Sequence, residues 1–374
     1  MKTQGKKWFK KKLDAMRLLD RYAIEETVER IAQRFGISPL EIVKLNQNEN
    51  FFLPKDMLRE LMQQVMEEYD PRIYPQDEEF RIKEKLSDYL NAPTDCIIIG
   101  NGEDEIIERI ARLFLEKGDA TISVTPTFSF YRLSANLMGA KHFEVPLKKD
   151  FSLDKEQILA TITSKTTLLF LCSPNNPTAN QFSIDEVEFL VEEFPGVVVV
   201  DEAYVEFAEY SLLPLIEKYE NLIVLRTFSK AFGLAGLRLG YGVASSDLAT
   251  ILSKKAQLPY PVSSFALKVA LELLANHDIV EKAIRQLKDE RGALIKELNE
   301  VTGVKAFDSK SNFVLFQTDN QSDEVYQKLL RRGIFVRNIK NSLLKNCLRT
   351  TVGLPEMNAK MLRALEKPAV NRNE

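Results

Sequence analysis

One lysine, Lys230, stands among small and apolar residues in the stretch RTFSKAFGLAGLRLGYG, residues 226–242, and a second fixed cation, Arg238, follows eight residues later. A lysine at the protein surface normally has polar neighbours, so these surroundings indicate a buried ammonium group. Burial and a nearby cation both lower the pKa of a lysine, and the neutral amine that results can act as a nucleophile or a base. The role of this lysine depends on the other polar residues that the fold places around it.

Further polar groups come directly after apolar runs. The run CIIIG is followed by GNGEDE, where glycines ahead of a helix leave backbone N–H groups to bind an anion such as phosphate, although they also fit a plain tight turn. Asp201 follows VVVV, and a carboxylate buried there needs a partner, whereas one in solvent does not. Asn176, in PNNPT, fits a simple turn as well. With Tyr204 and Lys230, these groups are expected around one crevice.

The elements that would position these groups are short strands and helices in alternation. From residue 96 on, runs such as TTLLFLCS and VVVVDEAY lack polar alternation, which is typical of strands buried on both faces of a parallel sheet. This pattern predicts a large α/β domain over residues 51–255, with ligands beyond the carboxyl ends of its strands. A long amphipathic helix and three later strands predict a smaller α+β domain over 256–374, which the N-terminal segment 1–50 joins.

The composition excludes several classes of function. The chain has 374 residues, a net charge of −3 and a pI near 5.8, so it has no overall basic field for nucleic acid or anionic lipid. Its three cysteines are far apart, which argues against a disulfide framework or a cysteine metal site and agrees with a reducing cytosol. It has only two histidines, which argues against histidine metal sites and Ser-His-Asp triads. The basic N-terminus lacks a following apolar segment, so we expect a solvated arm and no secretory signal. No apolar run approaches the roughly 18 residues of a membrane helix.

The stretches around these polar groups resemble the active site of the fold-type-I pyridoxal-phosphate aminotransferases, and the resemblance extends over nearly the whole chain. SKAFGLAGLRLGY is its most specific part, and DEAYVEF and NNPT come in the expected order. Within that superfamily, LNQNEN, RIYP and GIFVRN…CLRTTVG are most similar to the histidinol-phosphate aminotransferases. The resemblance implies a mostly parallel seven-stranded sheet flanked by helices, a smaller α+β C-terminal domain, bound pyridoxal 5'-phosphate, no metal, and a cytoplasmic homodimer.

The same resemblance implies roles for individual residues. Lys230 would bond to the cofactor aldehyde and move the proton at the substrate Cα, Asp201 would pair with the ring nitrogen, and Tyr204 would donate to the ring oxygen. The implied cofactor-binding residues are Gly102, Glu103, Asp104, Phe128, Asn176, Asp201, Tyr204, Thr227, Ser229, Lys230 and Arg238, with Tyr74 reaching the cofactor of the neighbouring subunit. The implied substrate-binding residues are Tyr22, Asn176, Arg337 and Arg349.

The implied reaction transfers the amino group of L-histidinol phosphate to 2-oxoglutarate and gives imidazole acetol phosphate and L-glutamate, a step of histidine biosynthesis. Arg349 would bind the substrate carboxylate, and Arg337 would bind the phosphate of histidinol phosphate. In the other half-reaction the same two arginines would bind the two carboxylates of glutamate.

Alternative functions use the same scaffold. A broad phenylalanine or tyrosine aminotransferase would keep every cofactor contact and need only one of the two arginines. Threonine-phosphate decarboxylases usually have a proline where this chain has Ala235, and a regulator would need a DNA-binding domain ahead of LNQNEN, for which we expect no room. The chain also departs from the family where FFLP follows NEN, at Ala179 in place of glycine, and at Glu103 in place of a small residue. These departures affect the shape of the pocket.

Overall fold

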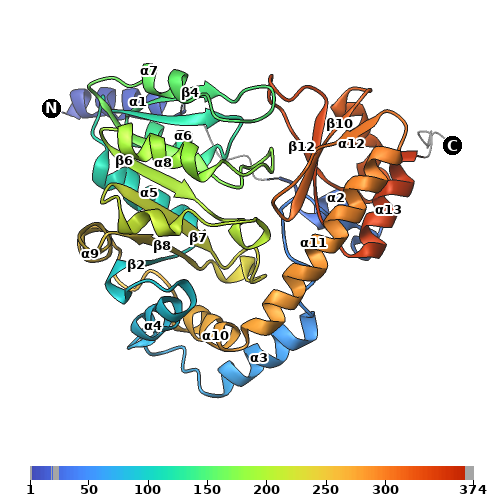
Figure 1. Ribbon diagram of the computed structural model, residues 1–374, viewed down its shortest axis with the longest axis horizontal. Helices are drawn as coiled ribbons and strands as arrows, with labels where there is room; N and C mark the ends of the chain where they lie inside the picture. The colour runs from blue at the N-terminus through green and yellow to red at the C-terminus, as the bar shows by residue number, and fades with distance from the viewer. Residues whose placement is uncertain (1, 18, 20–24, 367–374) are drawn as a thin grey trace.

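The computed structural model describes residues 2–17, 19 and 25–366, and its largest sheet has seven strands in the order β2-β8-β7-β6-β5-β3-β4 (Figure 1). Every strand runs parallel to its neighbours except β8, which is antiparallel to both β2 and β7. The strands are β2 Ile97–Gly100, β3 Ala120–Thr125, β4 Lys141–Pro146, β5 Thr166–Cys172, β6 Val197–Asp201, β7 Leu222–Thr227 and β8 Gly240–Ala244. The predicted mostly parallel seven-stranded sheet is confirmed.

Helices cover both faces of this sheet, which explains why its strands read as continuous apolar runs. In β6, Val198 and Val200 pack in a cluster that contains residues of α8, whereas Val199 packs on the opposite face with residues of α5. This sheet and the helices that pack against it form the first lobe of the molecule. Its helices are α3 Lys55–Glu67, α4 Glu78–Leu90, α5 Glu103–Phe114, α6 Phe130–Leu137, α7 Lys155–Ala160, α8 Ile184–Glu193, α9 Ser246–Lys254 and α10 Ser264–Ala275. Short 3₁₀ helices connect them at η2 Thr94–Cys96, η3 Val205–Phe207, η4 Leu213–Glu217 and η5 Ala235–Leu237.

A second lobe is built on a four-stranded antiparallel sheet in the order β12-β13-β10-β9. Its elements are η1 Pro39–Glu41, β1 Val43–Lys44, α2 Val28–Phe35, α11 His277–Glu300, β9 Val304–Ala306, β10 Phe313–Thr318, α12 Ser322–Leu330, β11 Ile334–Phe335, β12 Arg337–Asn338, β13 Cys347–Thr351 and α13 Pro355–Glu366. The N-terminal segment joins this lobe because β1 pairs with β11 in parallel. Helix α2 ends just before Gly36, which takes the left-handed conformation at φ 63°.

The long helix α11 connects the two lobes, running from beside α10 up to the four-stranded sheet (Figure 1). Helix α10 packs against α3 and α4 of the first lobe, although it follows residue 255 in the chain. The division of the chain into domains at residues 50 and 255 stays a prediction.

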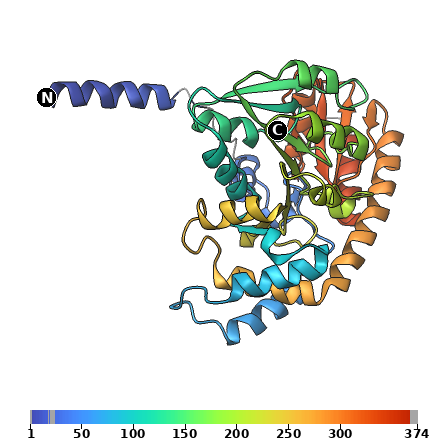
Figure 2. The same ribbon diagram turned by 60° about the vertical axis from the view of Figure 1, so that its left-hand side comes forward.

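The basic N-terminal segment forms helix α1, Lys2–Arg17, which projects from the rest of the molecule (Figure 2). The side chains of residues 7–17 are exposed, as expected of a solvated arm. Within the described ranges, no helix has both the length and the apolar character needed to cross a membrane.

Candidate active site

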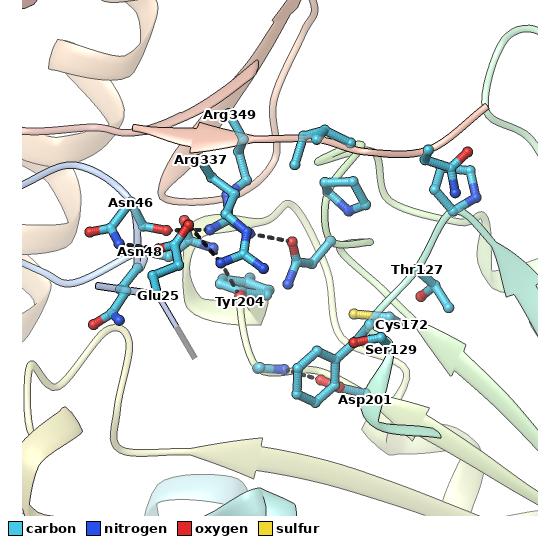
Figure 3. A pocket seen from close by; sticks show the side chains of 18 of the residues that line it. Glu25, Asn46, Asn48, Thr127, Ser129, Cys172, Asp201, Tyr204, Arg337 and Arg349 are labelled. Carbon is cyan, nitrogen blue, oxygen red and sulfur yellow. Dashed lines mark hydrogen bonds and ion pairs between the residues drawn. The ribbon is translucent and has the colours of Figure 1, made fainter. Parts of the chain in front are cut away.

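A cavity of about 870 Å³ lies where the carboxyl ends of the parallel strands face the four-stranded sheet. Most of the predicted site residues line it, from both lobes, and Glu25, Asn46 and Asn48 of the N-terminal segment line it as well (Figure 3). These lining residues are Glu103, Asp104, Phe128, Asn176, Asp201, Tyr204, Thr227, Ser229, Lys230, Arg238, Arg337 and Arg349. Residues separated by more than 200 positions in sequence therefore meet in one cavity.

Lys230 follows β7 and reaches the cavity close to Tyr204, another predicted catalytic residue. Its Nζ donates a hydrogen bond to the carbonyl oxygen of Gln47 at 3.0 Å and lies 5.7 Å from the ring centre of Tyr204. Burial, and secondly the positive charge of Arg349, lower the pKa of Lys230 to about 8. A substantial fraction of the amine is neutral near physiological pH, so Lys230 is suited to attack a carbonyl group or accept a proton.

Asp201 ends β6 and is buried, with hydrogen-bond donors on both carboxylate oxygens. The backbone N–H of Ala203 donates to Oδ1 at 3.0 Å, and the hydroxyl of Tyr131 donates to Oδ2. Glu103 lies beside Asp201, and burial together with the Asp201 charge raises the pKa of Glu103 well above its ordinary value. Burial thus favours the protonated form of the Glu103 carboxyl group.

The start of α5 provides an anion site next to Arg238. Gly102 precedes the helix at φ 79°, and a Cβ atom at this position would lie 2.6 Å from Nη2 of Arg238. A Cβ on Gly240 of β8 would lie 2.3 Å from the backbone nitrogen of Glu103, so glycine is required there for the close approach of β8 to the start of α5, and at Gly102 for the positive φ. Among the described residues no side chain caps α5, which leaves backbone donors at its N-terminus for an anion.

Arg238, Thr227 and Ser229 border this helix start. The Arg238 guanidinium donates to Oδ2 of Asp104 at 3.0 Å and remains half-exposed. The hydroxyl oxygen of Thr227 accepts a hydrogen bond from the backbone N–H of Ser229 at 3.1 Å, which fixes the loop that leads to the lysine. A cation, two hydroxyl groups and a helix N-terminus together suit a phosphate group.

Three asparagines bind Tyr204 or Arg349 in the same cavity. The side-chain amide of Asn48 donates to the Tyr204 hydroxyl oxygen at 3.0 Å, and burial raises the pKa of Tyr204, so the phenol keeps its proton. Arg349 donates to Oδ1 of Asn176 at 2.6 Å and to the carbonyl oxygen of Asn46 at 2.6 Å. The Tyr204 hydroxyl group and Arg349 are thus held in fixed positions.

The second arginine, Arg337, is paired with a carboxylate from the N-terminal segment. Nη1 of Arg337 lies 2.7 Å from Oε1 of Glu25, and the other oxygen of Glu25 accepts a hydrogen bond from the side chain of Asn46 (Figure 3). An acidic side chain thus occupies the position at which a substrate anion was expected.

Of the predicted site residues that the structure describes, two do not line the cavity. Gly102 lies just behind it, against Arg238. Tyr74 is 71% exposed and stacks on Tyr260 with ring centres 4.9 Å apart, so its predicted role in a neighbouring subunit stays a prediction. Tyr22 lies outside the described residues. In the described part of the chain, no group of acidic, histidine or cysteine side chains could hold a metal ion.

Sequence reasoning missed Tyr131, Asn46, Asn48 and Glu25. Tyr131 follows Phe128 by three residues and lies at the start of α6, so helical spacing was an available signal. The two asparagines belong to LNQNEN, a stretch used only for the resemblance. Nothing in the sequence around Glu25 distinguishes it from the adjacent Glu26.

The arrangement as a whole can bind a phosphorylated aromatic aldehyde. Lys230 provides the amine, the start of α5 with Arg238 provides the phosphate site, and Asp201 provides the charge that a protonated ring nitrogen needs. Phe128 lines the same cavity and offers an aromatic face. Two further cationic groups, Arg337 and Arg349, remain for a second small molecule.

This fold and site define a class of pyridoxal-dependent transferases, and the model of the family "aminotransferase class I and II" matches residues 41–365. The chain belongs to that family. It is 36% identical to the histidinol-phosphate aminotransferase of Ruminiclostridium cellulolyticum over 336 residues, 88% of this chain and 93% of that one. It is 38% identical to the enzyme of the same name from Methanosarcina barkeri over 349 residues, 92% of this chain and 93% of that one.

Among solved structures, the chain is similar to histidinol-phosphate aminotransferase from Sinorhizobium meliloti in complex with pyridoxal 5'-phosphate. The TM-score is 0.84 at 24% identity, and the match covers 94% of this chain and 95% of that one. At this identity the likeness concerns the fold.

Proposed function

We propose that this chain binds pyridoxal 5'-phosphate and transfers the amino group of L-histidinol phosphate to 2-oxoglutarate. The observation that carries the proposal is that Lys230, Asp201 and the uncapped start of α5 line one cavity with two arginines. The two curated relatives quoted above are named histidinol-phosphate aminotransferase, and the match covers 93% of each of them.

The cofactor would be held at three points. The start of α5 and Arg238 would bind its phosphate, Asp201 would bind its ring nitrogen, and Tyr204 with Asn176 would contact the ring oxygen. When bound, the cofactor supplies a ring that withdraws electrons from the substrate Cα. The charge on Asp201 favours this because it keeps the ring nitrogen protonated.

The chain's own residues would perform the remaining steps. Lys230, with its lowered pKa, would take the proton from the substrate Cα and hold it on Nζ, as a base near neutral pH can. Arg349 binds the carboxylate of glutamate, and for this its hydrogen bonds to Asn176 and Asn46 hold the guanidinium in place.

Arg337 decides between two candidate functions. A phosphorylated donor needs an anion-binding group at the far end of the cavity, and Arg337 is 30% exposed there. Its ion pair with Glu25 favours the second candidate, an aminotransferase for phenylalanine and tyrosine, because a neutral side chain needs no free cation at this place.

A spectrophotometric half-reaction separates these candidates. The protein loaded with cofactor is mixed with L-histidinol phosphate or with L-phenylalanine, and conversion of the bound cofactor to its amine form is followed by absorbance. We expect a fast response with L-histidinol phosphate and a slow one with L-phenylalanine. Equal responses would favour the aromatic aminotransferase, and no cofactor band at all would exclude both.

We also propose a homodimer with shared active sites that works in the cytoplasm. Large apolar side chains are exposed in segments 66–80 and 258–260, which carry the Tyr74–Tyr260 stack, and such a surface suits a partner subunit. These side chains are Met66, Ile73, Tyr74, Phe80, Leu258 and Tyr260. The three cysteines are all unpaired, which agrees with a reducing compartment.

A further inference from the structure

Glu25 enters the cavity from the segment just ahead of α2 and lies between two groups of different origin. Its Oε1 is 2.7 Å from Nη1 of Arg337 on β12, and its Oε2 accepts a hydrogen bond from Asn46, which follows β1. The side chain of Glu25 is only 15% exposed. Figure 3 shows it directed at Arg337 and Arg349.

The surroundings of Glu25 are strongly cationic. Arg337 and Arg349 are opposite each other on neighbouring strands, and the carbonyl oxygen of Asn46 accepts a hydrogen bond from Arg349. Glu25 therefore neutralises one cation of this pair and is linked through Asn46 to the other. A carboxylate of the chain itself binds where the proposed reaction needs an anion of the substrate.

The contact is one that a solute can compete for. Residues 25–27 belong to no helix or strand, and Arg337 is still 30% exposed. A phosphate group has more charge and more acceptor oxygens than a carboxylate, so it competes well for a guanidinium group. A hydroxyl or phenyl group cannot replace the carboxylate, because it would leave Arg337 and Glu25 both without a partner.

We propose that Glu25 is a specificity-determining residue that occupies Arg337 until an anionic group of the substrate displaces it. Phosphorylated donors exchange one anion for another at Arg337, whereas uncharged donors leave the ion pair intact. The inference rests on the proposed function, because it takes Arg337 as the site for the distal anion. Removing the Glu25 charge should strengthen the binding of donors that place an anionic group at Arg337 and leave the binding of uncharged donors unchanged.

Two donors that differ in a single group test this: L-histidinol phosphate and L-histidinol. In the holoenzyme, Glu25→Gln keeps the size of the side chain and its ability to bind Asn46. We expect its KM for L-histidinol phosphate to fall by about three- to tenfold, in line with the loss of one competing, partly exposed ion pair, with little change in kcat or in KM for L-histidinol. Glu26→Gln is the matched control, since Glu26 pairs with Arg34 at the surface, 2.6 Å away, and should leave both KM values unchanged.

A binding measurement without turnover gives an independent readout. Titration calorimetry of the holoenzyme with glycerol 3-phosphate should show tighter binding in Glu25→Gln by a similar factor, and loss of that binding in Arg337→Gln. An unchanged or raised KM for L-histidinol phosphate in Glu25→Gln, or an equal change for both donors, would overturn the inference.

The two proposals fail in different ways. If Arg337→Gln weakens glycerol 3-phosphate binding while Glu25→Gln does not strengthen it, only the role of Glu25 is wrong. If Arg337→Gln changes neither this binding nor the preference between the two donors, Arg337 is not the phosphate site, and the histidinol-phosphate activity and the role of Glu25 are both wrong.

Discussion

Arg337 and Arg349 are direct cross-strand partners, one on β12 and the other on the antiparallel strand β13. Like charges in this position destabilise a sheet, so the arrangement costs the fold free energy. Part of the repulsion is offset by Glu25, which pairs with Arg337, and by the oxygens of Asn176 and Asn46, which accept from Arg349. Such a pair is expected where two anionic groups of a small molecule must be bound side by side.

The first prediction concerns Arg349. Replacement by lysine keeps the charge but loses the two hydrogen bonds that orient the guanidinium, to Asn176 and to Asn46. We expect kcat/KM to fall by about 10²-fold for L-glutamate and for L-phenylalanine alike, since both carry an α-carboxylate and the loss is about the effect of two charge-assisted hydrogen bonds. Steady-state kinetics of the holoenzyme measure this, with the exposed Arg331→Lys as control. A loss confined to one donor would show that Arg349 does not hold the shared carboxylate.

The second prediction concerns Lys230. Lys230→Ala removes the amine whose pKa is lowered to about 8, and we expect the rate of amino transfer to fall by at least about 10³-fold while the fold is retained. Single-turnover absorbance measures the rate, and circular dichroism checks the fold. Lys255→Ala, an exposed lysine beyond α9, should behave as wild type. Near-wild-type transfer in Lys230→Ala would exclude the proposed chemistry.

The third prediction concerns the pH dependence of stability and the buried pair of Glu103 and Asp201. The pKa of Glu103 in the folded protein lies above its ordinary value of 4.5, because of burial and the neighbouring charge. Between these two values the unfolded chain releases the Glu103 proton and the folded chain retains it. The contribution of Glu103 to stability is therefore greatest below about pH 4.5 and declines as the pH rises toward its folded pKa.

Glu103→Gln has no proton to release at this position and should lose that dependence. We measure the free energy of unfolding of the cofactor-free protein by denaturant titration. Between about pH 5 and about pH 8, we expect the value for Glu103→Gln minus the value for the wild type to increase with pH. Glu108→Gln, on the exposed side of the same helix, is the control. A constant difference between Glu103→Gln and wild type over this range would mean that Glu103 is ionised in the fold.

The fourth prediction concerns Tyr74 and the proposed shared sites. In a mixed dimer of Lys230→Ala and Tyr74→Ala subunits, one of the two sites has both an intact Lys230 and an intact Tyr74 from the other subunit. Co-expression should therefore restore activity and tight cofactor retention that neither parent has. The purified mixture is assayed for both, and sedimentation gives its mass. A monomer, or a mixture no better than its parents, would contradict the shared site.

The order of strands and helices in the first lobe could be read from the sequence because burial on both faces leaves a local signal. VVVVD became β6, and TTLLFLC became β5, each buried along nearly its whole length. Helix α10 has no such signal: its sequence SFALKVALELLA is apolar on almost every side, since it is buried against α3 and α4, and so lacks the periodicity of an amphipathic helix. The two-residue pair of β1 and β11 is too short to predict.

The sequence by itself determined the chemical groups of the site, because Lys230, Asp201 and the glycines around α5 sit at strand ends that a parallel sheet must bring to one edge. Only the tertiary structure decided how those groups are paired. The contacts of Asp201 with Tyr131 and Glu103, and of Arg337 with Glu25, join segments far apart in the chain. Spacing along a sequence cannot fix such contacts, since the partner of a buried charge depends on which elements pack across the cavity.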